Sequence, residues 1–82
     1  MKIDFQGMSG DALLLEPREI YDPCVIGTCA VSGRAIYDVS KIISAFSEAN
    51  GCSLEESEEY VDFNILQDYM GTHTPIYLFP SE

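Results

Sequence analysis

Two helix-boundary motifs stand close together in the second half of the chain and limit its fold more than any other feature. Asn50-Gly51 is typical of a helix C-terminus, because glycine adopts the left-handed conformation there at little cost. Ser53-Leu54-Glu55-Glu56 matches a capping box, in which the Ser53 hydroxyl and the Glu56 carboxylate each accept a hydrogen bond from the other residue's backbone N–H. The sequence therefore predicts that one helix ends at Gly51 and that a second begins at Ser53.

Apolar residues recur at helical spacing on both sides of this boundary. Asp38 or Ser40 can cap the first helix. Its apolar face is expected to comprise Val39, Ile42, Ile43, Phe46 and Ala49. In the second helix, Leu54, Val61 and Ile65 form one apolar stripe, and this helix is expected to end before Gly71.

Short apolar runs bounded by glycine and proline flank the two helices. Residues 24–31 and 34–38 are rich in β-branched and small residues and are joined through Ser32-Gly33, which predicts a β-hairpin. Residues 75–80 form a proline-bounded apolar run, which predicts a final strand against the hairpin. We therefore expect an α+β fold, with a small antiparallel sheet of hairpin plus C-terminal strand packed against two helices.

The length of the chain predicts one domain, residues 1–82, because about 80 residues bury only roughly 60 to 65% of the surface of the unfolded chain. Residues 1–19 are expected to form an N-terminal arm or an edge strand. Within them, residues 12–15 are apolar and fit either a short strand or one helical turn, and they stop at Glu16-Pro17 because a residue before proline is pushed out of the α region.

Charge narrows the class of partner. Fourteen acidic residues against four basic ones give a net charge of −10, while a hydrophobic fraction of 46% indicates a folded domain rather than an acidic tail. Residues 38–82 contain nine acidic residues and one basic residue, Lys41. Such a field repels nucleic acids and anionic membranes and attracts the basic grooves in which other proteins hold nucleic acid. We expect a basic protein or ribonucleoprotein complex as the partner, with no direct binding to nucleic acid or membrane.

The strongest candidate site is a row of carboxylates on the second helix. Its members stand at i, i+3, i+4 and i+7 and project to one side, beside the apolar stripe: Glu55, Glu58, Glu59 and Asp62. Carboxylates held roughly 5 to 6 Å apart can imitate phosphates and engage Arg and Lys. These four residues and Asp68 are the predicted partner-binding residues. The alternative is a solvated helix face that keeps the protein soluble, but such faces ordinarily mix charges of both signs.

The sequence contains no motif for metal binding or for nucleophilic catalysis. Cys24, Cys29, Cys52 and His73 supply zinc-ligand types but contain no close C-x2-C pair, so buried structural thiols are the favoured interpretation. No nucleophile elbow surrounds the serines or the histidine. We therefore predict no catalytic residues, no metal and no cofactor. An odd number of cysteines without a secretory signal predicts a reducing, cytoplasmic compartment.

Three segments resemble a widespread family of small, mostly uncharacterised proteins encoded by tailed bacteriophages and prophages. The most specific segment contains Phe63-Asn64, then Tyr69-Met70-Gly71 and Thr74-Pro75-Ile76. The other two segments are Tyr21-Asp22-Pro23-Cys24-Val25-Ile26-Gly27 and Gly33-Arg34-Ala35-Ile36-Tyr37-Asp38 leading to Lys41-Ile42-Ile43. The resemblance implies a phage origin and a shared α+β fold with residues 20–80 as the family core, and it brings no known catalytic residues.

Charge and resemblance together predict a phage-encoded inhibitor that docks its acidic C-terminal half onto a basic nucleic-acid-binding surface of a host defence complex. Small acidic phage proteins often look like anti-CRISPR and DNA-mimic inhibitors, and this analogy between classes makes Cas proteins the specific expectation. The alternative is a small structural or regulatory phage protein that self-associates, for example as a homodimer, through its sheet edge and aromatic residues. A metal-dependent enzyme or zinc module is the third possibility. The expected location is the cytoplasm of the infected bacterial host.

Overall fold

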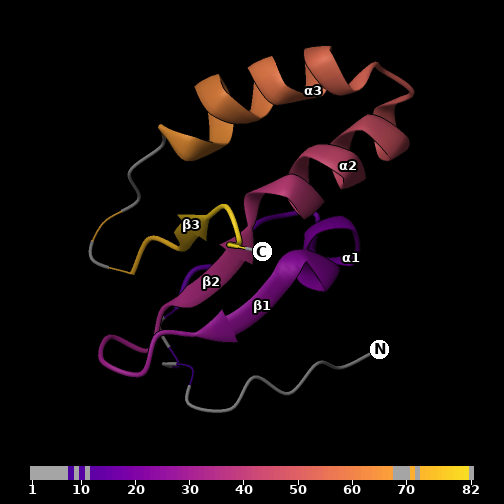
Figure 1. Ribbon diagram of the computed structural model, residues 1–82. Coiled ribbons are helices and arrows are strands. Elements are labelled where there is room, and N and C mark those ends of the chain that lie inside the picture. The colour runs from indigo at the N-terminus through magenta and orange to yellow at the C-terminus, as the bar shows by residue number, and fades with distance from the viewer. Residues whose placement is uncertain (1–7, 9, 11, 68–70, 72, 82) are drawn as a thin grey trace.

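The computed structural model describes residues 8, 10, 12–67, 71 and 73–81 (Figure 1). In chain order the described elements are α1 (Arg18–Tyr21), the 3₁₀ turn η1 (Asp22–Cys24), β1 (Val25–Thr28), β2 (Ala35–Asp38), α2 (Val39–Asn50), α3 (Leu54–Val61), the π-helical turn η2 (Asp62–Leu66) and β3 (Ile76–Leu78). Figure 1 shows α3 on the far side of α2 from the sheet. The predicted α+β class, with a sheet packed against helices, is confirmed.

The predicted hairpin is confirmed in β1 and β2, which pair antiparallel from Val25↔Tyr37 to Thr28↔Ala35, with an irregularity between Val25 and Gly27. The Cys29 N–H donates to the Arg34 carbonyl at 2.8 Å and so closes the connection between the strands. Gly33 has a φ of 75°, in the left-handed region that glycine adopts without a Cβ clash. The Ser-Gly pair therefore makes the turn that the sequence predicts.

The C-terminal strand is present, but its predicted antiparallel direction is wrong. β3 pairs parallel with β2, with Ile36 opposite Ile76 and Asp38 opposite Leu78, and the strand order is β1-β2-β3. The physical reason is the long connection between the two strands. The chain passes from the end of β2 through α2 and α3 and re-enters the sheet beside the start of β2, as a parallel pair requires. The sheet is therefore mixed, with an antiparallel hairpin and one parallel edge strand.

The helix predicted to end at Gly51 is α2, and it agrees with the prediction at both ends. The Asp38 side chain caps it by accepting a hydrogen bond from the Lys41 N–H at 3.2 Å. At the other end Gly51 has a φ of 66°, and its N–H donates to the Ser47 carbonyl. Because Asp38 also ends β2, the strand passes directly into the helix, and this fixes α2 on the sheet.

One buried cluster joins the helices to the sheet: Tyr21, Cys24, Ala35, Tyr37, Val39, Ile42, Val61 and Ile65. Leu14 and Leu15 pack against it, although residues 12–15 form neither of the two predicted structures, a strand or a helical turn. This segment is fixed instead by two hydrogen bonds. The Leu13 N–H donates to the His73 carbonyl at 3.3 Å, and the Leu15 N–H donates to the Tyr37 hydroxyl at 2.8 Å. Among the residues that the structure describes, no helix is long and apolar enough to cross a membrane.

Candidate functional site

The candidate site is built on α3, which begins with the predicted capping box. The Glu56 N–H donates to the Ser53 hydroxyl at 3.1 Å, and the Ser53 N–H donates to the Glu56 carboxylate at 3.3 Å. An N-cap of this kind contributes about 0.5 to 2 kcal/mol to helix stability. It also fixes the first turn, which carries Glu55.

Two contacts hold α3 on α2. Ser57 is fully buried, at 0% exposure, and its hydroxyl donates to the Ile43 carbonyl at 2.6 Å. On the next turn, the rings of Tyr60 and Phe46 stack with centroids 4.1 Å apart and planes inclined by 16°. The small side chain of Ser57 brings the helices together, so the orientation of the outer face of α3 is set by packing.

The four predicted site residues that the structure describes are all exposed and all come from α3 and its π-helical extension: Glu55, Glu58, Glu59 and Asp62. All four line one groove between α2 and α3. The fifth predicted residue, Asp68, lies outside the described residues. Within the described part of the chain, none of the four carboxylates forms an ion pair.

None of the three described basic side chains forms an ion pair with the carboxylate row. Arg18 donates from Nε to the Asp22 carboxylate at 2.6 Å, and this bond holds the pKa of Arg18 above its ordinary value. Arg34 donates to the Ser32 hydroxyl at 3.2 Å and to the Thr74 carbonyl at 3.3 Å. Lys41 lines a separate shallow depression beside α1. The negative charge of the row is therefore not neutralised by these groups.

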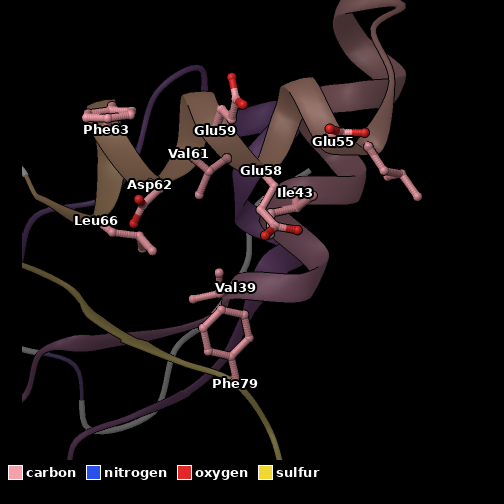
Figure 2. Close-up of a pocket in the computed structure, with 11 residues that line it drawn as sticks. Val39, Ile43, Glu55, Glu58, Glu59, Val61, Asp62, Phe63, Leu66 and Phe79 are labelled. Carbon is pink, nitrogen blue, oxygen red and sulfur yellow. The ribbon is translucent and has the colours of Figure 1, made fainter.

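The carboxylate row borders an apolar groove of about 600 Å³ (Figure 2). The described residues of the groove come from α2, from α3 with its π-helical turn, and from the segment after β3. Val39 and Val61 are buried in it, whereas Leu54, Phe63 and Phe79 remain 59%, 71% and 68% exposed. Large apolar side chains exposed together around a concavity are typical of binding surfaces.

The four carboxylates do not all point the same way. Figure 2 shows Glu58 and Asp62 directed toward the side of the groove where Val39 and Leu66 lie, whereas Glu59 points away from it. Glu59 also borders a smaller depression with Glu56 and Tyr60 on the outer side of the helix. Glu58 and Asp62 therefore form an inner pair that faces the groove, and Glu59 lies at the outer edge of the row.

Sequence reasoning missed the apolar half of this site. The predicted stripe of Leu54, Val61 and Ile65 is correct for the last two, which are buried, but Leu54 lies on the groove rather than in the core. Ser57 takes a fully buried position on the same helix face. Its place between Leu54 and Val61 was the signal that a close helix contact lies there. Nothing in the local pattern connects Phe79 with this helix, because the contact depends on where β3 returns the chain.

The cysteines differ in environment and are all free. Within the described residues, no three His, Cys, Asp or Glu side chains are grouped so that they could hold a metal ion. Burial raises the pKa of the Cys24 thiol. The pKa of Cys29 is lowered to about 7, chiefly by hydrogen bonds from Ser32 in the hairpin turn, whose N–H lies 3.5 Å from the sulfur.

This difference predicts selective alkylation. The thiolate is the nucleophile, so the rate of iodoacetamide labelling at Cys29 should rise with pH through a midpoint near 7, whereas an ordinary thiol titrates near pH 8.5. Cys24 should react more slowly at every pH because it is buried and its pKa is raised. Mass spectrometry of peptides after timed labelling measures both rates. Equal midpoints at the two residues would contradict the assignment.

The site thus combines four exposed carboxylates with an apolar groove on one face of the α2–α3 pair. No family model, curated protein or solved structure matches the chain.

Proposed function

We propose that this protein is a binding protein rather than an enzyme, and that its acidic α3 face docks onto a basic surface where a partner holds nucleic acid. A phage-encoded inhibitor of a host defence complex, acting in the cytoplasm of the infected bacterium with Cas proteins as its targets, is the specific form of this proposal. The observation that supports it is the row of exposed carboxylates that the described basic side chains leave without neutralisation.

Electrostatics favours this function over a merely solubilising one. Like charges at i, i+3 and i+4 destabilise a helix by about 0.2 to 0.5 kcal/mol per pair. The row contains several such pairs and no lysine that would relieve them. Positive groups on a partner would remove this repulsion on binding, and the charge of −10 would accelerate the encounter at low salt.

The test is a double charge reversal, Glu58→Lys with Asp62→Lys, measured against purified Cas effector complexes. Each complex is titrated with the protein, and displacement of fluorescent target DNA is followed by anisotropy. We expect the wild-type protein to displace the DNA, and the variant to bind at least about 100-fold more weakly. Binding should weaken steeply as salt rises, because screening shortens the range of the attraction.

A matched control changes the same charge at another place. Glu19→Lys with Glu48→Lys alters two carboxylates that share a depression between α1 and α2, away from the groove. This variant should retain most of the affinity, with only the general loss expected from lower net charge. Equal loss in both variants would reduce the effect to overall charge and contradict a site on α3.

The alternative function, self-association, is tested by sedimentation of the protein alone. The sheet offers β1 and β3 as its edge strands. A dimer held by strand pairing and apolar contacts would persist at high salt and in the Glu58→Lys, Asp62→Lys variant. Such a dimer, together with failure to displace DNA from any complex, would favour the structural or regulatory function.

A further inference from the structure

The groove beside the carboxylate row is apolar, and charge alone does not explain it. Two of its residues, Val39 and Val61, are at most 2% exposed, while its margins carry Leu54, Phe63 and Phe79, each more than half exposed. A purely electrostatic contact would gain nothing from exposed phenylalanine rings. Burying apolar surface is worth about 25 cal/mol per Å², so these rings favour a partner that brings apolar side chains of its own.

The charge of the groove wall selects among apolar partners. Glu58 and Asp62 face the groove in Figure 2, and Glu55 lines the same wall one turn earlier. No basic residue lines the groove within the described part of the chain. A neutral or acidic apolar segment would have to desolvate these carboxylates without compensation, whereas Lys or Arg beside the apolar residues would pair with them.

The spacing of the wall favours a helical partner over an extended one. From Glu55 to Asp62 the wall covers about 10 Å, at about 1.5 Å per residue. A helix lying along α3 repeats its side chains at the same interval of about 5 to 6 Å and can match each carboxylate. An extended segment places same-face side chains about 6.6 Å apart and falls out of step with the row.

We propose that the groove formed by α2, α3 and the segment at Phe79 binds an amphipathic basic helix of the partner protein. Its aliphatic side chains would cover Val39 and Val61, and its flanking Lys or Arg residues would pair with Glu55, Glu58 and Asp62. This inference rests on the proposed function and deepens it, because it names the element of the basic partner that α3 recognises.

The experiment uses peptides as the probe. The first is a synthetic Leu–Lys peptide of about 14 residues with leucines at i, i+3, i+4 and i+7, the spacing of groove-binding helices. The second has the same composition in an order that cannot form an apolar face, and the third is oligolysine of equal charge. Affinity for the 82-residue chain is measured by fluorescence anisotropy at low and high salt, and peptide helicity by circular dichroism.

The first peptide should bind at least about tenfold more tightly than the other two and become helical on binding. Leu54→Ala with Phe79→Ala should remove this preference without unfolding the protein, since both side chains are more than half exposed. Val31→Ala, at a hairpin residue that is 97% exposed, is the matched control and should leave every affinity unchanged. Thermal unfolding of each variant verifies that the fold is intact.

The outcomes separate this inference from the proposed function. If all three peptides bind equally, and only Glu58→Lys with Asp62→Lys weakens them, the acidic face stands and the helix-binding groove is overturned. If the first peptide binds through Leu54 and Phe79 with no dependence on salt or on that charge reversal, the acidic docking face is overturned. If none of the peptides binds, the inference is overturned while DNA displacement still tests the proposed function.

Discussion

Replacing Ile42 by alanine is expected to lower the free energy of unfolding by about 2 to 5 kcal/mol. Ile42 is fully buried at 0% exposure, in the first turn of α2 and within the cluster that joins the helices to the sheet. The loss combines the transfer free energy of the deleted methyl and methylene groups with a cavity that a small core cannot close. Because domains of this size have unfolding free energies near the lower end of about 5 to 15 kcal/mol, a large fraction of the stability is at stake.

Thermal and urea unfolding followed by circular dichroism measure the effect. The midpoint should fall on the order of 10 to 30 °C, since about 1 kcal/mol corresponds to about 4 to 8 °C in a domain of this length. Ile42→Val is the matched control and should lose only about 0.5 to 1.5 kcal/mol. A loss below about 1 kcal/mol for Ile42→Ala would mean that α2 does not pack into the core as described.

The local elements could be predicted because their boundaries are written in short-range chemistry. Asp38, Gly51 and Ser53 act on backbone groups within a few residues of themselves, and each does what its residue type favours. The hairpin follows likewise from Ser32-Gly33 between two apolar runs. These features need no knowledge of the rest of the fold.

The direction of β3 and the apolar half of the site could not be predicted in the same way. Both depend on where the chain returns after α3, and no residue near Ile76 records whether β2 runs parallel or antiparallel to it. Phe79 and Val39 are distant in sequence and meet at the groove only because β3 lies beside β2. The exposed positions of the four carboxylates could be predicted, because they follow from the helical repeat of one continuous segment.

A predicted contact and an unpredicted one together explain how α3 tolerates its charge. Repulsion along the row weakens the helix, but the capping box at Ser53 and the buried contact of Ser57 with the Ile43 carbonyl hold it in place. These contacts lie on the N-terminal turn and the inner face, so they leave the acidic face free. The capping box and the Ser57 contact therefore hold α3 in place without using any of the four carboxylates of the row.

The buried hydroxyl of Tyr37 helps to hold the segment at Leu15 on the sheet. The side chain is fully buried, and its oxygen accepts a hydrogen bond from the Leu15 N–H at 2.8 Å. Its ring contacts that of Tyr77 on the parallel strand, with centroids 6.0 Å apart. Burial raises the pKa of the Tyr37 phenol above its ordinary value of 10, so the folded state favours the neutral form.

Tyr37→Ala should therefore be among the most damaging substitutions in the protein, with a loss of about 3 to 5 kcal/mol from the lost burial of the ring and the cavity that it leaves. Tyr37→Phe separates the ring from the hydroxyl: it keeps the packing but leaves the Leu15 N–H without its bond, for a loss of about 1 to 3 kcal/mol. A near-neutral Tyr37→Phe variant would contradict the buried hydrogen bond.

The hydroxyl also predicts how stability depends on alkaline pH. Because the pKa of Tyr37 is higher in the folded than in the unfolded state, the stability it contributes is complete below pH 10 and is lost as pH rises through the folded pKa. The pKa of Tyr21 is raised by burial in the same sense, so Tyr37→Phe should flatten the alkaline decline without removing it. Urea unfolding of wild type and variant between about pH 8 and 11 measures the two slopes. Identical slopes would show that the Tyr37 phenol ionises as readily in the folded protein as in the unfolded chain, and would contradict its burial.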